Sequence, residues 1–224
     1  MSARAVKFAV VFVTLALVSS AAAGSGYHVL KTIPIASGEA TWDFGTIDES
    51  TRRLFVAHET QVEVLDVDSG KKLGTISDMK GAHGIALAPE FKHGFVTNGD
   101  NGTITMFDLN TLARATDITA GNLPDSIVYD PATRRVFAFN TMSRNSTVIN
   151  ASDGKVVGSI DLDGKPEFTV ADGSGHVFVD LVDKGSIARI DSQQMTISQR
   201  WPVADCDRPT SLAIDKKKIG RAHV

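Results

Sequence analysis

The chain has 224 residues, of which 42% are hydrophobic and 22% are charged, and its net charge is −3. This balance is typical of an ordinary globular protein, and it gives no nucleic-acid signal, because the one cationic run, residues 216–218, is more typical of a solvated turn. Cys206 is the only cysteine, so the chain has no internal disulfide. Its thiol is either a buried small apolar group or has a partner outside this sequence.

Residues 1–23 have the pattern of an export signal. Arg4 and Lys7 form a positive segment, and an apolar stretch of eleven residues follows at 8–18. Residues 21–23, all alanine, offer a cleavage site. Eleven residues are too few to cross a hydrocarbon core of about 30 Å as a helix, which favours a cleaved signal over an uncleaved membrane anchor. We therefore expect a periplasmic or secreted protein with no membrane span after removal of the signal.

Four phenylalanines recur along the rest of the chain at intervals of 40, 42 and 41 residues. Each lies in a short apolar run, and two further columns follow at the same period. The columns are Phe55, Phe95, Phe137 and Phe178; Asp66, Asp108, Asn150 and Asp191; and Ile76, Ile118, Ile160 and Trp201. A period near 40 residues with several strand-like runs per repeat is typical of a β-propeller with one four-stranded blade per repeat.

Helical repeats of similar period do not fit the chain. HEAT-type and armadillo repeats need apolar residues at helical spacing over a dozen residues or more, whereas the runs here are four to six residues long. Gly, Asp, Asn and Pro bound the runs, and pairs such as Asp153-Gly154 tolerate the positive φ of a hairpin turn. The sequence therefore predicts an all-β fold.

The columns divide residues 24–218 into four blades and the start of a fifth. The expected blades cover residues 41–76, 83–118, 125–160 and 167–201, and the fifth begins at Arg208. Residues 28–33 match residues 72–76, the outer strand of the first blade, so they are an orphan outer strand. We expect it to be loose or paired non-natively, because the blade that it would complete is absent. The prediction is a partial β-propeller, with four blades present as an open arc.

The run at residues 95–98, Phe-Val-Thr-Asn, is close to the Tyr-Val-Thr-Asn motif of one propeller family. From residue 27 to 218 the chain resembles these YVTN, or YncE-like, repeat proteins, although Val179-Asp180 departs from the motif in the fourth blade. The resemblance implies an exported seven-bladed propeller, with no assigned catalytic activity in most members. A more distant similarity to gluconolactonase-like propellers implies a metal ion in the central channel.

The last six residues break the repeat. Residues 208–218 match the start of the third blade, so an apolar run with a phenylalanine near position 220 should follow. Residues 219–224 read instead like a translated sequencing adapter. We interpret them as an artefactual tail and expect it to be disordered; the alternative is a genuine divergent C-terminus.

The residues that enter the innermost strand of each blade form the candidate site, because these strands surround the channel of a propeller. This column consists of Asp43, His83, Asp125 and Glu167. Three carboxylates and an imidazole are a donor set for a divalent metal ion. We predict ligand binding here and no cofactor, with a divalent metal ion as a second option. The alternative is that these side chains only bind backbone N–H groups where the strands begin.

Other polar and aromatic positions have simpler interpretations. A second column, which closes the second strand of each blade, is expected to cap turns, with its histidine at the surface. The two tryptophans are expected to pack between blades, although the first could stack on a ligand. Loop residues of mixed charge suit a protein, peptide or glycan partner. These three sets are His58, Asn98, Asn140 and Asp180; Trp42 and Trp201; and Asp100, Asn101, Arg144, Asp183 and Lys184.

The sequence contains no nucleophile elbow, phosphate-binding loop, dinucleotide fingerprint, zinc-helix motif or haem-attachment motif. We therefore favour a binding or scaffold module over an enzyme. The alternative is a metal-dependent hydrolase of the lactonase type, which would use the same four residues at the channel mouth.

Overall fold

The computed structural model describes residues 28–35, 41–215 and 222–223. The chain divides into two units, one up to Ile35 and the other from Ala36 onward. Residues 28–35 contain no helix or strand, in agreement with the expectation that the orphan segment at residues 28–33 is loose. The predicted signal, residues 1–23, lies outside the described residues. Within the described part, no helix is long and apolar enough to cross a membrane.

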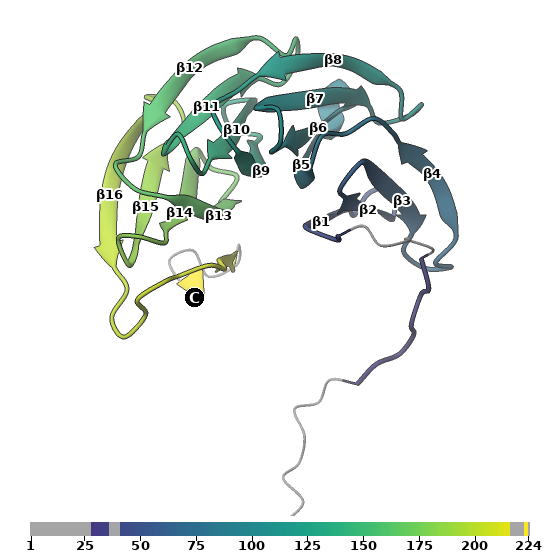
Figure 1. Cartoon of the computed structure of the whole chain (residues 1–224), viewed down its shortest axis with the longest axis horizontal. Coiled ribbons are helices and arrows are strands. Elements are labelled where there is room, and N and C mark those ends of the chain that lie inside the picture. Colours follow the sequence, from purple (N-terminus) through teal and green to yellow (C-terminus); the bar gives the residue numbers. More distant parts are fainter. Residues whose placement is uncertain (1–27, 36–40, 216–221, 224) are drawn as a thin grey trace, which may run out of the picture. The chain divides into compact units, whose positions relative to one another are not determined.

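The second unit contains four antiparallel sheets of four strands each, which follow one another around an open arc (Figure 1). Spatial order equals chain order within every sheet, so we call the sheets blades 1 to 4. This confirms the predicted all-β, unclosed, propeller-like fold.

The strands of blade 1 are β1 (Gly45–Asp48), β2 (Arg53–His58), β3 (Gln61–Asp66) and β4 (Lys72–Ile76). Those of blade 2 are β5 (Ala82–Ala88), β6 (His93–Asn98), β7 (Thr103–Asp108) and β8 (Arg114–Thr119), with a 3₁₀ turn η1 (Pro89–Phe91) after β5. Blade 3 has β9 (Pro124–Asp130), β10 (Arg135–Asn140), β11 (Asn145–Asn150) and β12 (Val156–Asp161). Blade 4 has β13 (Pro166–Ala171), β14 (His176–Leu181), β15 (Ser186–Asp191) and β16 (Thr196–Pro202).

A short hairpin follows blade 4. Strand β17 (Ala213–Ile214) pairs antiparallel with β18 (Ala222–His223). The expectation of a disordered tail is therefore wrong for residues 222 and 223, and the rest of the tail, residues 219–221 and 224, lies outside the described residues. An open strand edge pairs with any backbone that reaches it, whatever its side chains.

The apolar core lies between successive blades. Phe55 of blade 1 packs against Phe107 of blade 2, with 6.0 Å between the ring centroids. Phe95 belongs to the cluster shared by blades 2 and 3, and Phe137 to the cluster shared by blades 3 and 4. Each of these four rings is fully buried. Because neighbouring blades build each cluster together, blade stability depends on the neighbour, as in other repeat folds.

The fourth phenylalanine of the column has a different neighbour. Phe178 stacks on Trp201 of the same blade, with ring centroids 6.2 Å apart and an interplanar angle of 18°. The ring contact of Trp201 thus lies within blade 4. Phe178 lies on β14 and Trp201 near the end of β16, and their stacking places both rings on one face of blade 4.

A hydrogen bond also recurs between successive blades. The first residue of the second strand donates to the carbonyl oxygen just after the third strand of the next blade. The three bonds join Arg53 Nη1 to Leu109 O at 2.6 Å, His93 Nδ1 to Ala151 O at 2.9 Å, and Arg135 Nη1 to Ser192 O at 2.6 Å. Their sequence separations are 56, 58 and 57 residues, so the same contact recurs at each of the three interfaces between neighbouring blades.

We predict that Arg135→Met lowers the free energy of unfolding by about 1.5–3 kcal/mol, because the arginine also donates to Gln193 O and two carbonyl oxygens lose a charged donor. Chemical denaturation of the full chain measures the effect. Arg134→Met is the matched control, since the exposed side chain of Arg134 lies 3.6 Å from Glu90 in a surface ion pair. Equal stability of the two variants would contradict the role given to the recurring bond.

Candidate ligand-binding site at the channel mouth

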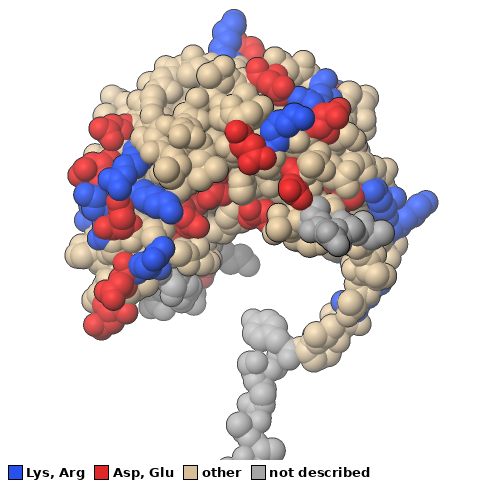
Figure 2. All heavy atoms as spheres, in the orientation of Figure 1, with Lys and Arg blue, Asp and Glu red and all other residues tan. Residues whose placement is uncertain are grey.

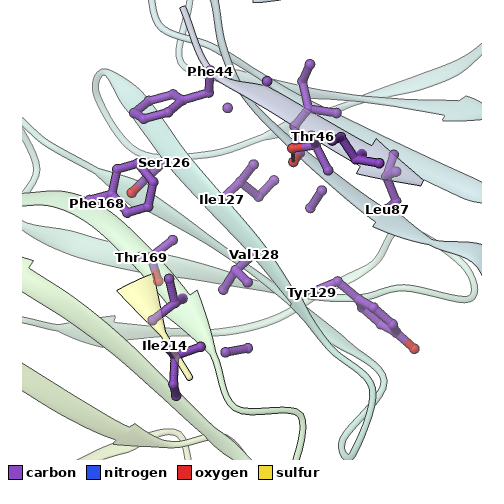
Figure 3. A pocket seen from close by; sticks show the side chains of 17 residues that line it. Phe44, Thr46, Leu87, Ser126, Ile127, Val128, Tyr129, Phe168, Thr169 and Ile214 are labelled. Carbon is purple, nitrogen blue, oxygen red and sulfur yellow. Dashed lines mark hydrogen bonds between the residues drawn. The ribbon is translucent and has the colours of Figure 1, made fainter. Parts of the chain in front are cut away.

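The first strands of the four blades surround a central pocket of about 380 Å³ (Figure 3). The same four positions of each blade line it: residues 44–47, 84–87, 126–129 and 168–171, together with Ile214. The lining is mostly apolar. We refer to this space as the central pocket.

The predicted column stands at the entrance of this pocket. In register, Gly45, Ile85, Ile127 and Thr169 face equivalent residues of the second strand in their blades. Asp43, His83, Asp125 and Glu167 each lie two residues before these pairs. They therefore occupy equivalent places, one residue before the pocket lining begins, and we call these four residues the channel mouth.

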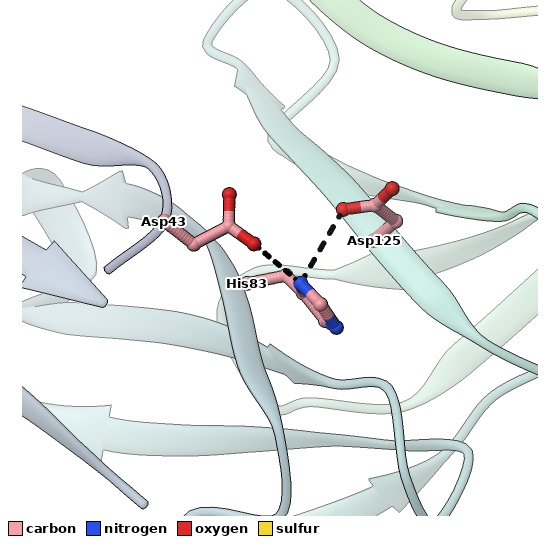
Figure 4. A group of neighbouring side chains, drawn as sticks. All are labelled: Asp43, His83 and Asp125. Atoms are coloured by element: carbon pink, nitrogen blue, oxygen red, sulfur yellow. Dashed lines mark hydrogen bonds and ion pairs between the residues drawn. The ribbon is translucent and has the colours of Figure 1, made fainter. Parts of the chain in front are cut away.

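Three of the four residues come together (Figure 4). His83 Nδ1 lies 2.5 Å from Asp43 Oδ2 and 3.8 Å from Asp125 Oδ1. One donor atom from each of the three residues falls within 4.8 Å of the others. Glu167 is not part of this group, so the structure brings together Asp43, His83 and Asp125 but not the fourth predicted residue.

The electrostatics of the channel mouth follow from this contact. The hydrogen bond to Asp43 raises the pKa of His83, and the nearby carboxylates of Asp125 and Asp100 add to this effect. Burial raises the pKa of Asp125 to about 6, against the opposing attraction of His83, and the charge of Glu167 raises it further. Carboxylates outnumber the single imidazole, so the mouth favours positive charge.

A layer of four residues lies directly below the channel mouth. Phe44 and Phe168 meet edge to face across the pocket, with ring centroids 5.2 Å apart. The other two members, Gly84 and Ser126, are small. A Cβ at Gly84 would lie 2.6 Å from the backbone oxygen of Asp125, so this position accepts only glycine without a shift of blade 3. Each of these four residues directly follows a residue of the predicted column, so the repeat period also places them in one layer. The prediction from the sequence did not include this layer.

The hydroxyl of Ser126 is an unusual member of this layer. Ser126 is 4% exposed, lines the central pocket, and its Oγ has no hydrogen-bond partner among the described residues. A buried hydroxyl without a partner is unfavourable by roughly 1–3 kcal/mol. The hydrogen-bonding capacity of this hydroxyl at the pocket wall is therefore unused in this structure.

The second predicted column is misaligned in blade 4. Asn98 and Asn140 pair in register with the first residue of the next strand, and in blade 4 the equivalent residue is Leu181. Asp180 instead occupies the place of Thr97. It accepts a hydrogen bond from Phe168 N at 2.7 Å, as Thr97 does from Gly84 N at 2.8 Å. Counting from the phenylalanine column would have shown this, because Asp180 follows Phe178 by two positions.

The column residues also do more than cap turns. Asn98 is buried and donates to Thr105 Oγ1 at 2.9 Å, while its own oxygen accepts from Lys80 N at 3.1 Å. His58 is 3% exposed and stacks on Trp42, with ring centroids 4.0 Å apart. The prediction of a surface histidine is therefore wrong, and the ring contact of Trp42 lies within blade 1.

Some of the charged loop residues pair with each other. Arg144 Nη2 lies 2.9 Å from Asp183 Oδ2, which joins the turn between β10 and β11 to the turn between β14 and β15. Lys184 lies 3.6 Å from Asp163. These ion pairs thus contribute to contacts between blades 3 and 4. They leave only part of the hydrogen-bonding capacity of these side chains for an external binding partner.

We predict that Asp180→Asn stabilises the protein at high pH. Asp180 is fully buried, its Oδ2 has no partner among the described residues, and burial raises its pKa to about 7, with a further contribution from Glu167. The folded protein therefore holds a proton that the unfolded chain releases near its ordinary pKa of 3.8, so stability falls as pH rises from about 4 to 7. The asparagine variant lacks this fall and gains about 2–4 kcal/mol at pH 8.

Denaturation at pH 4, 6 and 8 measures this difference between native and variant. Asp163→Asn serves as the control, because the Asp163 side chain is 83% exposed and its variant should follow the native pH profile. A parallel pH dependence for the native chain and Asp180→Asn would contradict the assignment.

No protein-family model matches this chain, and no curated protein matches it in sequence. Solved structures do match its fold. The β-propeller domain of Cps50 (Swd1) from Myceliophteria thermophila matches with a TM-score of 0.68 and 12% identity, over 84% of this chain and 62% of that one. Hydrazine synthase from Kuenenia stuttgartiensis matches with a TM-score of 0.66 and 17% identity, over 78% of this chain and 51% of that one.

The chain thus spans between half and two thirds of these two structures. At such low identity the likeness concerns the fold alone. The comparisons assign a β-propeller fold to the described blades, and no family.

Proposed function

We propose that the chain is an exported β-propeller protein of the YVTN, or YncE-like, kind that works as a binding module in the periplasm or outside the cell. The near-copy of the repeat motif at residues 95–98 and the export pattern at residues 1–23 support this proposal. Its ligand is presented by a protein, peptide or glycan partner and enters at the channel mouth.

The observation that carries the proposal is the convergence of Asp43, His83 and Asp125 from three blades above the central pocket. Partly buried charges are unfavourable unless they have partners. Packing alone would be served by apolar side chains at these positions. Binding residues on a rigid scaffold account for both the placement and the charge.

A capture experiment tests the binding role. The full chain and its Asp43→Asn/Asp125→Asn variant are immobilised and exposed to periplasmic extract and to culture medium. Bound proteins and small molecules are then quantified by mass spectrometry. We expect a specific component that the variant retains at least tenfold less than the native chain. Asp163→Asn is the control and should retain it fully, while thermal melts verify that each variant is folded. Identical retention by all three proteins would contradict the proposal.

A second candidate function is a metal-dependent hydrolase of the lactonase type. Two carboxylates and one imidazole within 4.8 Å are donors that divalent ions accept, and this favours the candidate. A divalent ion held by Asp43, His83 and Asp125 would polarise a carbonyl group and lower the pKa of a bound water. Under this reading Glu167, outside the cluster, is the carboxylate left for proton transfer.

Elemental analysis after dialysis, together with lactone hydrolysis assays, discriminates the second candidate from the first. The hydrolase predicts one divalent ion per folded chain, lost in the Asp43→Asn/Asp125→Asn variant, and turnover that depends on the ion. Retention of a partner without bound metal or turnover would leave the binding module as the function.

A further inference from the structure

We propose that the channel mouth and the central pocket together bind a primary ammonium group carried on an apolar chain. This inference rests on the proposed binding function and names the chemistry of its ligand. Two sources supply that chemistry: a free alkylamine, and a lysine side chain of a protein partner.

The charge at the mouth favours a cation. Asp43 Oδ2 and Asp125 Oδ1 both lie near one nitrogen of His83, so the site already places a nitrogen donor between two carboxylates (Figure 4). Each carboxylate has a second oxygen and further lone pairs, so both groups can also accept from an ammonium nitrogen that lies beside His83 at about 2.8 Å. The space-filling view shows acidic side chains at the inner edge of the arc (Figure 2). An anionic ligand would meet repulsion here.

The layer below the mouth suits the first carbon atoms of such a ligand. Phe44 and Phe168 offer aromatic rings within a layer that begins one residue below the carboxylates, and aromatic faces attract cations as well as apolar groups. The other two members, Gly84 and Ser126, add little side-chain volume to this layer. The Oγ of Ser126, which lacks a partner among the described residues, can accept one of the ammonium hydrogens.

The depth of the pocket suits an extended chain. Its lining runs over four consecutive residues of each first strand, which corresponds to about 10 Å at 3.3 Å per residue. Ile85, Ile127 and the methyl group of Thr169 give this wall its apolar character. Ile127 and Thr169 are labelled in Figure 3. A bare metal ion would occupy the three donors of the mouth and make no use of this space, which is why the observations favour an organic cation.

Isothermal titration of the full chain tests the inference. The probes are methyl-, butyl- and hexylammonium chloride, with 1-hexanol as the neutral match of the longest amine and calcium and zinc chloride as the metal probes. We expect affinity to rise by about fourfold for each added CH₂ group that enters the pocket. Hexylammonium should bind at least tenfold more tightly than 1-hexanol.

Variants locate the binding. Asp43→Asn, at a partly exposed position, should weaken hexylammonium binding at least tenfold without loss of fold, and Asp125→Asn should do the same. Asp163→Asn should bind as the native chain does. A short acetylated and amidated Gly-Lys-Gly peptide distinguishes the sources: binding of the peptide identifies a lysine side chain, and binding of the free amine alone identifies an alkylamine.

Affinity that is independent of chain length, hexylammonium binding that survives Asp43→Asn, or binding of metal ions only would each overturn the inference. Its failure is distinguishable from failure of the proposed function. If the capture experiment yields a component that depends on Asp43 and Asp125 while no amine binds, only the ligand chemistry is wrong. If neither a captured component nor amine binding is observed, the proposed binding function is wrong as well.

Discussion

The hydrogen bond from the first residue of a blade's second strand to the next blade is the contact on which the rest of the structure depends. Apolar packing between blades is strong but non-directional, and Phe55, Phe95 and Phe137 could tolerate small rotations within their clusters. Arg53 and Arg135 end at carbonyl oxygens 2.6 Å away, which leaves little freedom. The bond is directional, and so it turns a stack of sheets into an arc of regular curvature.

The candidate site inherits its geometry from that regular step. Asp43, His83 and Asp125 belong to different sheets, and no strand hydrogen bond links one to another. They converge because each blade repeats the previous one with the same offset. A site of this kind has no local sequence motif, since its parts are separated by whole repeats. It becomes visible only when equivalent positions of the repeats are compared.

This explains how much of the molecule could be predicted from the sequence. The phenylalanine column fixed the blades because strand alternation and a constant period leave few other folds. The same period identified Asp43, His83 and Asp125. It did not separate Glu167 from them, because side-chain direction and the width of the arc are not encoded in spacing. Asp180 was misplaced by one position, although the register with Phe178 was present in the sequence. The stacking of Trp42 on His58 depends on rotamers and had no signal in the pattern.

The contact between Phe44 and Phe168 has a consequence for the order of folding. Each interface between neighbouring blades closes a loop of moderate length, whereas this pair joins the first and last blades of the arc. Loop closure over longer segments is slower and comes after local contacts have formed. The floor of the channel mouth is thus completed only once all four blades are in place. A chain in which blade 4 is not yet in place lacks this floor beneath the three residues of the mouth, so ligand binding would report on assembly of the whole arc.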